Sequence, residues 1–352
     1  MKYCFVIFLS LITLLSSCEK EGLDFSLSDT KVIFISRRIE NSADWLLYSM
    51  NSDGTQQEKI TDLISRCEKP VVSRSGNSVL FAHYTEDNYY ELYLINIDGT
   101  NPTLIDRAKR YCGSADWSND DTKIIYSKSR NESTDEKDLI LLDLSTSKKE
   151  TLTVSGNNIS AKFNPNKRIV FCCEINNSYG VWTMDIDGSN KQLIIPDASC
   201  PVWSPDGKKI AYISRGEIGS PQIFVADFDG SNSKQLTDSY LPCWDSGFPP
   251  FGNSNPQWTP DSKKIVFVSD VNDGLPEIYI MNSDGTHQKR LTDTDRRNDS
   301  PDISSDGNFI LFSSNRDLDY SHDIFVMDIN GKNQTALSKY TGDDSFPVTV
   351  MK

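Results

Sequence analysis

Short apolar runs alternate with polar turn residues along nearly the whole chain. The clearest unit is SCPVWSPDGKKIAYIS (199–214), followed by PQIFVADFDGSNSKQLTD (221–238). Its runs are rich in Val, Ile, Tyr and Phe, which favour strands, and they end at Pro, Asp and Gly, which favour turns. No helical period of useful length interrupts them after the first residues. The pattern predicts an all-β protein built from hairpins.

The same unit recurs along the chain at intervals of about 45 residues, a length typical of one propeller blade. One aromatic residue in the second run of each copy fixes the register: Phe34, Phe81, Tyr126, Phe171, Tyr212, Phe267 and Phe312. Each copy reads as four strands, and such a sheet has two apolar faces that only its neighbours can cover. We therefore expect a seven-bladed β-propeller of four-stranded antiparallel blades. Six blades, with the N-terminal copy displaced, is the alternative.

The two ends of the propeller are expected to complete one blade together. The tail Ser345-Phe346-Pro347-Val348-Thr349-Val350 resembles the first run of the other copies and would pair with residues 31–62. A competing assignment puts residues 25–27 in that place. The preferred interpretation is a single propeller over 31–352, closed by a C-terminal strand at 345–350.

The N-terminus has the features of an export signal. Lys2 is followed by an apolar stretch that is too short to span a bilayer comfortably, and then by Leu15-Ser16-Ser17-Cys18. That string resembles a bacterial lipobox, in which the chain is cut before a cysteine that then carries the lipid. We expect residues 1–17 to be the signal peptide, Cys18 the lipidation site and 18–30 a tether. The protein would then sit in the cell envelope, on the periplasmic or surface side of the outer membrane, held by lipid only.

Charge and residue counts exclude several classes of function. The net charge of -14 argues against a nucleic-acid partner and against adsorption to an anionic membrane. Three His and no paired CxxC give no metal pattern, and we expect no metal and no cofactor. The turns of D-x-D-G type lack the length and the final Glu of a calcium loop. Among the cysteines, sequence leaves every pairing open, and Cys67 with Cys112 is one hypothesis because they occupy equivalent positions in neighbouring blades.

The repeat P-x-W-S-P-D-G-K-K-I-x-Y/F-x-S, followed by I-F/Y-V/I-x-D/N-x-D-G and L-T-D, resembles the propeller repeats of TolB-like proteins. The resemblance covers about residues 25–350 and, with the lipobox, is similar to TolB-like lipoproteins of Bacteroides-type bacteria. It implies a periplasmic propeller. The sequence between Cys18 and Lys31 has no room for the α/β domain that TolB adds, so the Tol-system partners are not expected. Oligogalacturonate lyases share a similar propeller with a His-rich metal site, which implies the competing enzyme interpretation.

One loop breaks the period and supplies the candidate binding site. Residues 239–252 are longer than their counterparts and carry Tyr240, Trp244, Phe248 and Phe251 between prolines. Exposed aromatic side chains on a stiff loop suit glycan stacking or a protein contact. Arg296 and Arg297 in the next such connection are expected nearby. The starts of the inner strands predict a polar tunnel rim, with Glu68, Ser254, Asp299 and Asp344 as its candidate side chains.

These features favour a non-enzymatic envelope protein that acts as a protein- or glycan-binding scaffold, and a monomeric propeller. The competing interpretation is a glycan-active enzyme that uses rim carboxylates, with or without a metal. An enzyme would need two or three acid, base or metal-binding groups that converge in one cleft.

Overall fold

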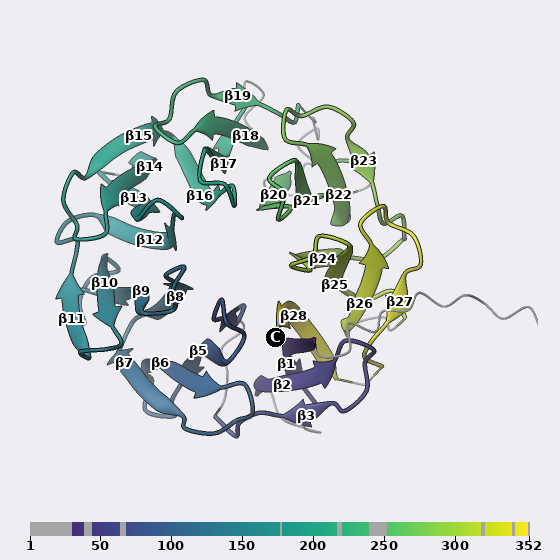
Figure 1. The fold of residues 1–352 in the computed structure, drawn as a ribbon, viewed down its shortest axis with the longest axis horizontal. Coiled ribbons are helices and arrows are strands. Elements are labelled where there is room, and N and C mark those ends of the chain that lie inside the picture. Colours follow the sequence, from purple (N-terminus) through teal and green to yellow (C-terminus); the bar gives the residue numbers. More distant parts are fainter. Residues whose placement is uncertain are drawn as a thin grey trace, which may run out of the picture.

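The computed structural model describes residues 30–38, 44–63, 68–176, 178–216, 220–238, 252–272, 274–317, 321–339 and 342–350. These residues form seven four-stranded sheets around a central axis, as Figure 1 shows. All pairings within the sheets are antiparallel. The predicted all-β, seven-bladed propeller is therefore confirmed, and the six-bladed alternative is wrong.

From the axis outward, the first blade holds β28 (Asp343–Val350), β1 (Lys31–Arg37), β2 (Leu46–Asn51) and β3 (Glu58–Lys59), and the second β4 (Val71–Val72), β5 (Ser78–Tyr84), β6 (Tyr90–Asn96) and β7 (Thr103–Ala108). The third holds β8 (Cys112–Trp117), β9 (Lys123–Ser129), β10 (Lys137–Asp143) and β11 (Lys148–Thr151), and the fourth β12 (Asn157–Phe163), β13 (Arg168–Ile175), β14 (Ser178–Asp185) and β15 (Gln192–Pro196). The fifth holds β16 (Ala198–Trp203), β17 (Lys209–Arg215), β18 (Pro221–Asp227) and β19 (Lys234–Gln235). The sixth holds β20 (Asn253–Trp258), β21 (Lys264–Ser269), β22 (Glu277–Asn282) and β23 (Lys289–Arg290), and the seventh β24 (Asn298–Ile303), β25 (Phe309–Ser314), β26 (Asp323–Asp328) and β27 (Thr335–Ala336).

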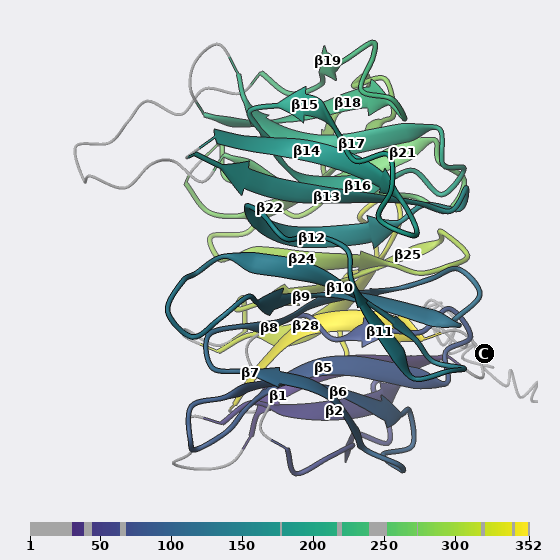
Figure 2. The same ribbon diagram turned by 90° about the vertical axis from the view of Figure 1, so that its left-hand side faces the viewer.

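The core lies in the seams between neighbouring blades, where the sheets stack face to face (Figure 2). All seven anchor aromatics are at most 3% exposed. In five blades the anchor ring also stacks on an aromatic residue of the adjacent third strand, as Phe34 does on Tyr48 with ring centroids 5.8 Å apart. Burial of both faces of every blade explains why the apolar pattern is strong in the middle strands and weak in the outer ones.

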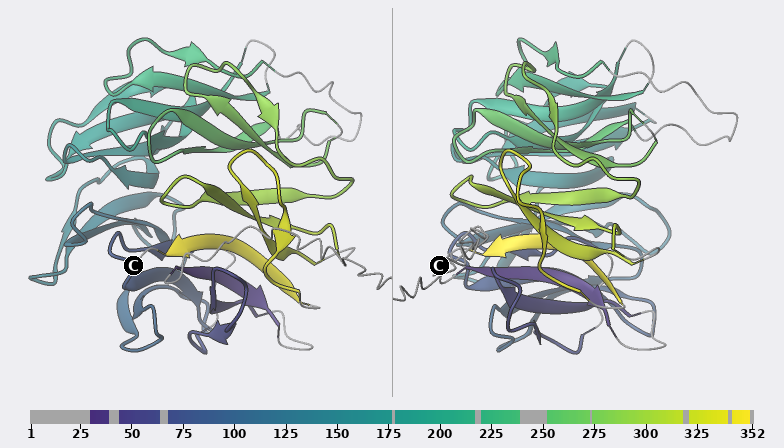
Figure 3. Two further views of the ribbon diagram at one scale, coloured as in Figure 1. Left: turned by 45° about the vertical axis from the view of Figure 1, so that its right-hand side comes forward. Right: turned by 90° about the vertical axis from the view of Figure 1, so that its right-hand side faces the viewer.

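The ring is closed by the two ends of the described chain. β28 pairs antiparallel with β1, from Lys31 opposite Val350 to Arg37 opposite Asp343. In Figure 3 the yellow β28 lies beside the purple β1, so residues from the start and the end of the propeller share one sheet. The competing segment 25–27 lies outside the described residues.

The turns between third and fourth strands reverse the chain tightly and also contact the preceding blade. In the fifth blade, Asp229 Oδ1 accepts hydrogen bonds from the backbone N and the hydroxyl of Ser231, which holds the turn shut. Gly230 has a φ of +85°, and a Cβ at this position would lie 2.4 Å from the carbonyl oxygen of Ile194 in the preceding blade. Glycine is therefore required both by the backbone conformation and by the contact between blades.

The L-T-D motif that ends most repeats has a structural role that the pattern alone did not reveal. Its hydroxyl accepts a hydrogen bond from a backbone N of the third strand at 2.9 Å, for Thr153 with Leu139, Thr237 with Ile223, Thr292 with Ile278 and Ser338 with Ile324. The chain after each short fourth strand is thereby tied to its own blade.

Within the described residues, no helix has the length and apolar composition needed to cross a bilayer.

Candidate functional site

A tunnel of about 780 Å³ runs along the propeller axis. Its wall is made by the inner strands, and six of these carry a bulge whose first residue has a positive φ between 51° and 56°: Ser114, Ser160, Cys200, Asn255, Ser300 and Phe346. All six border the tunnel. Four of them are followed by proline, which cannot donate a ladder hydrogen bond and therefore suits a bulge. The repeat thus lines much of the wall with small side chains and with the proline rings of Pro201, Pro256 and Pro301.

Two ion pairs near the tunnel wall join different blades: one spans the seam between the third and fourth blades, and the other reaches past the inner strand of the first blade, from the segment before β4 to β24. Lys69 Nζ lies 2.7 Å from Asp302 Oδ1, and Lys162 Nζ lies 3.3 Å from Asp116 Oδ1. The second oxygen of each carboxylate accepts a backbone N–H at 2.9 Å, from Thr349 for Asp302 and from Phe163 for Asp116. Each of these two carboxylates therefore has a fixed orientation at the wall.

Glu68 and Tyr111 lie together on the tunnel wall, next to Gly113. A Cβ on Gly113 would be 2.8 Å from Glu68 Oε2 and 3.4 Å from the Tyr111 hydroxyl, so glycine leaves the room that both side chains occupy. Burial, and then the neighbouring Glu68 carboxylate, raise the pKa of Tyr111 well above its usual range. At neutral pH the Tyr111 hydroxyl is therefore protonated and can donate a hydrogen bond.

A second, smaller hollow of about 180 Å³ lies between the sixth and seventh blades. It brings together three of the predicted residues, Ser254, Asp299 and Arg297. Arg297 Nε is 3.9 Å from Asp299 Oδ2, and Asp299 Oδ1 accepts a hydrogen bond from Ser300 Oγ at 3.1 Å. This hollow is polar and adjoins the tunnel, since Asn255 and Ser300 border both.

The prediction that Asp344 lies on the tunnel rim is wrong. Its side chain is fully buried, and it accepts hydrogen bonds from Ser36 Oγ at 2.5 Å and from Arg38 Nε and Nη2 at 3.1 and 2.6 Å. The equivalent residues Asn158, Asn253 and Asn298 are also buried and bind groups of the preceding blade. This position of the inner strand points into the seam rather than into the tunnel, because side chains alternate along a strand.

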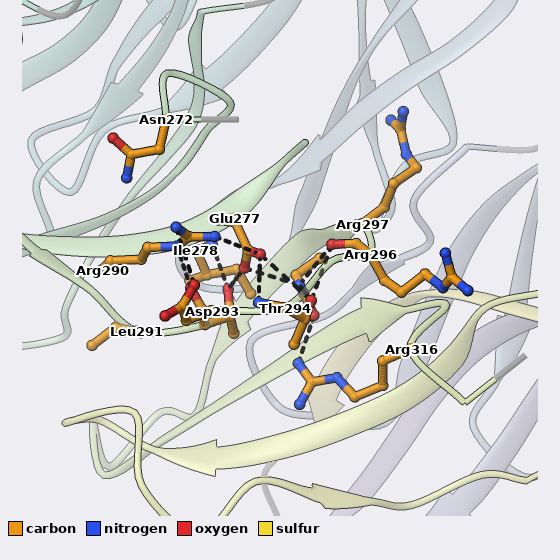
Figure 4. A network of polar contacts seen from close by, with 12 residues as sticks. Asn272, Glu277, Ile278, Arg290, Leu291, Asp293, Thr294, Arg296, Arg297 and Arg316 are labelled. Atoms are coloured by element: carbon orange, nitrogen blue, oxygen red, sulfur yellow. Dashed lines mark hydrogen bonds and ion pairs between the residues drawn. The ribbon is translucent and has the colours of Figure 1, made fainter. Parts of the chain in front are cut away.

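The buried Glu277 explains the arrangement of the predicted arginines. Figure 4 shows this carboxylate at the centre of a polar network. It accepts hydrogen bonds from Arg290 Nη2, Thr294 N and Asn298 Nδ2, each at 2.9 Å, and one from the hydroxyl of Thr292. The carbonyl oxygen of Arg296 joins the network by accepting from Thr294 Oγ1 and Asn298 Nδ2. In Figure 4 the side chains of Arg296 and Arg297 point away from Glu277, which leaves them on the face of the molecule where the inner strands begin.

His322 is bound to the first residue of the closing strand. Its Nδ1 and its backbone N lie 3.1 and 2.9 Å from Asp343 Oδ1. Burial alone would lower the pKa of His322, but the hydrogen bond to Asp343 and the nearby Asp299 carboxylate outweigh it and raise that pKa above its ordinary value. Among the residues that the structure describes, no three His, Cys, Asp or Glu side chains converge as metal ligands would.

Several predicted site residues fall outside the described part of the chain. They are the lipidation site Cys18, the loop residues Tyr240, Trp244, Phe248 and Phe251, and Cys67 of the hypothetical disulfide. Cys112 is fully buried and packs in the cluster that holds Leu80 and Leu92. The pairing of Cys67 with Cys112 stays a prediction, as does the aromatic binding loop.

Two curated relatives align with part of the chain. The uncharacterized protein Atu1656 of Agrobacterium fabrum is 31% identical over 113 residues, which cover 32% of this chain and 34% of that protein. The Tol-Pal system protein TolB of Bordetella pertussis is 28% identical over 156 residues, which cover 34% of this chain and 35% of TolB. Each match therefore spans about a third of the relative's length.

Three solved structures share the fold. TolB from Acinetobacter baumannii superposes with a TM-score of 0.57 at 20% identity, covering 91% of this chain and 82% of TolB. An oligogalacturonate lyase from Vibrio parahaemolyticus gives 0.63 at 15% identity, covering 88% and 86%. The β-propeller domain of the Trilobed protease from Pyrococcus furiosus gives 0.66 at 13% identity, covering 89% and 95%. At these identities the likeness concerns the fold alone.

The family is shown by the repeats themselves. Residues 79–241 and 250–349 match the family model described as the TolB beta propeller domain, PD40. The matched residues make up most of the chain and run from the second blade to the closing strand β28. The chain belongs to the TolB beta-propeller (PD40) family.

Proposed function

We propose that this protein is a non-enzymatic binding propeller of the cell envelope, anchored through a lipid on Cys18, that receives a polypeptide segment in its axial tunnel. The observation that carries the proposal is the tunnel of about 780 Å³ with its pre-oriented wall. Carboxylates that are already held by a cation and a backbone N–H are suited to recognition, because no reorganisation is needed when a ligand binds.

The composition of the wall favours a polypeptide over a glycan. Pro201, Pro256 and Val202 give it apolar patches, and Lys69 and Gln257 place polar groups between them. The two tryptophans that border the tunnel, Trp203 and Trp258, are only 7% and 6% exposed, so neither offers an open ring face for sugar stacking. An extended chain, with alternating apolar side chains and backbone amides, matches such a surface.

The distribution of carboxylates supports binding rather than glycan cleavage. Glu68 and Asp302 both border the tunnel, but Asp302 is already held by Lys69 and by the backbone N of Thr349. Asp299 borders the smaller hollow, and Asp344 is sealed in a seam. An acid–base pair for glycoside chemistry needs two carboxyl groups on either side of one scissile bond. Assays of reducing-end release with wild-type, Glu68→Gln and Asp299→Asn proteins test the enzyme alternative. Turnover by wild-type protein that either substitution abolishes would replace the binding proposal.

The tunnel is tested by filling it. Val202 and Val348 both border it, and changing each to Trp adds bulk inside the wall. Val154 is 77% exposed and is not among the residues that border the tunnel, so Val154→Trp is a matched control. We expect the wild-type and control proteins to capture the same envelope protein, by in-cell crosslinking and mass spectrometry, and the Val202→Trp/Val348→Trp protein to lose it. Equal capture by all three would reject the tunnel as the site, and capture of glycan alone would reject the polypeptide.

A further inference from the structure

Two of the free cysteines meet at the seam between the fourth and fifth blades. The backbone N of Cys200, in the bulge of β16, donates a hydrogen bond of 3.2 Å to Sγ of Cys172 in β13. Cys172 is 2% exposed, whereas Cys200 is exposed and borders the tunnel. Cys200 can therefore be reached from the tunnel, and the Cys172 thiol lies directly behind the Cys200 backbone.

The repeat shows what these two positions hold elsewhere. Cys172 directly follows the anchor Phe171, and Ser127 and Ser313 occupy the same place after their own anchors. Cys200 is the positive-φ residue of its bulge, where Ser114, Ser160 and Ser300 stand in other blades. In the seam between the seventh and first blades, Phe346 N donates to Ser313 Oγ at 3.2 Å, which is the same contact made with a hydroxyl. At the seam between the fourth and fifth blades, both positions that hold a serine in several other blades thus hold a cysteine.

The geometry is compatible with a covalent bond. A contact of 3.2 Å between Cys200 N and Cys172 Sγ puts the two Cα atoms at most roughly 7.5 Å apart. Disulfides usually span up to about 6.8 Å, so at this upper limit a small shift of the β16 bulge is needed to close the bond. The neighbouring Cys173 points to the other face of β13, where it packs with Ile125 and Leu139, so it does not compete for Cys200. Cys112 lies in a different seam, beside Leu80 and Leu92.

We propose that Cys172 and Cys200 form a disulfide that joins the fourth and fifth blades at the tunnel wall. The oxidant is a small-molecule or protein disulfide. The Cys200 thiolate attacks it, forms a mixed disulfide and releases one thiol. The Cys172 thiolate then attacks Cys200 Sγ and releases the second thiol. Two protein thiols are oxidised by two electrons and one disulfide is reduced to two thiols, so the exchange balances.

Burial sets the speed of this exchange. It raises the pKa of Cys172 to about 12 and also raises the pKa of Cys200. Few thiolates are present at neutral pH, so closure is slow there and accelerates as the pH rises towards 9. The bond would fix the spacing between β13 and the inner strand β16 and would remove a free thiol from the tunnel wall. It does not depend on the ligand proposed above.

Peptide mapping of the full chain tests the bond. The protein is incubated with oxidised glutathione at pH 8.5, denatured, alkylated and digested with trypsin. We expect a peptide of residues 169–191 linked to one of 192–208. Because both Cys172 and Cys173 lie on the first peptide, single variants assign the partner. Cys173→Ser should keep the link, and Cys172→Ser and Cys200→Ser should each abolish it.

The serine variants carry the residue that the repeat already uses at these positions, so we expect all of them to fold. Oxidised wild-type protein should also melt about 2–5 °C above its reduced form. That shift should vanish in Cys172→Ser and Cys200→Ser but not in Cys173→Ser. Full alkylation of Cys172 and Cys200 after oxidation, or a link through Cys173, would overturn the proposal.

Discussion

Arg38 and Asp344 form a buried two-pronged ion pair that joins the start of the propeller to its end. Arg38 Nη2 lies 2.6 Å from Asp344 Oδ2 and its Nε lies 3.1 Å from Oδ1. The guanidinium also covers the rings of Phe34 and Tyr48, with centroid distances of 5.2 and 5.1 Å. The pair thus lies where β28 meets β1 and stabilises the blade on which ring closure depends.

Removing the carboxylate of Asp344 should therefore be costly. Asp344→Ala removes the buried acceptor of three hydrogen bonds, one from Ser36 and two from Arg38, and we expect a loss of about 3–5 kcal/mol in the free energy of unfolding. Asp62→Ala, which removes the exposed partner of Lys59, is the control and should leave the unfolding midpoint unchanged. Urea titration followed by tryptophan fluorescence measures both. Equal midpoints for Asp344→Ala and wild type would mean that closure does not rely on this pair.

Substitution of two turn glycines can distinguish the energetic cost of backbone strain from the cost of a collision between blades. Gly230 and Gly274 both have a positive φ, but a Cβ on Gly274 would meet nothing within 4 Å. We expect Gly274→Ala to cost about 1–2 kcal/mol, from the left-handed conformation alone. Gly230→Ala should cost more than that, because its Cβ also collides with the Ile194 carbonyl oxygen. Thermal denaturation of the two variants checks the order, and the reverse order would contradict the contact argument.

The hydroxyl of the L-T-D motif can be removed without changing side-chain shape. Thr292 donates to Glu277 and accepts from Ile278 N, and all three groups are buried. Thr292→Val leaves a buried N–H and a carboxylate each short of one partner, with an expected cost of about 1–3 kcal/mol. Thr335→Val is the matched control, because that hydroxyl is exposed and bonds only its local backbone. Chemical denaturation should separate the two variants clearly.

Stability should depend on pH through His322 and Asp343. The pKa of His322 is raised above its ordinary 6.5, so its stabilising contribution is complete below that value and is lost as the pH rises through the folded-state pKa. Burial opposes the shift in Asp343, but the hydrogen bonds from His322 lower its pKa below 3.8, so its contribution is lost only in more acidic solution. We expect the stability difference between wild type and His322→Gln to be largest near pH 5 and to fall above pH 6.5. A difference that does not vary with pH would show that the pair is not charged.

The lipid anchor is a prediction about residues outside the described part of the chain. Cys18→Ser should prevent lipidation and shift the protein from the membrane fraction to the soluble envelope fraction. Labelling with an alkyne fatty acid, together with fractionation, measures the effect in cells. Cys173→Ser, which removes a buried thiol, is a control and should not change the distribution.

Much of the fold could be predicted because each structural feature of a blade recurs in several copies of the repeat. The anchor aromatics and the turns recur in every blade or nearly so, and a single degenerate copy such as residues 25–36 could not hide the register. It was harder to predict which side of a strand each side chain occupies, the tunnel side or the seam side. Asp344 looked like a rim residue, yet the bulge after Ser345 and the alternation of the strand turn it into the seam.

The candidate site was predicted only in part for the same reason. Ser254, Asp299 and Arg297 do meet in one hollow, because they belong to the starts of adjacent inner strands. The pairing of Lys69 with Asp302 and the meeting of Cys172 with Cys200 join residues from different blades. A repeat pattern gives the structure of one blade, but such contacts depend on how far each sheet is rotated against the next.

The pairing of β28 with β1 also has a consequence for biogenesis. The first sheet cannot be completed until the C-terminal residues have been synthesised, so its inner edge stays open while six other sheets form. Such a late, long-range pairing slows folding and exposes an unpaired edge to aggregation. A chain that stalls before residue 343 would thus keep a permanent gap in the ring, and proteases could distinguish unfinished molecules from finished ones by that open edge.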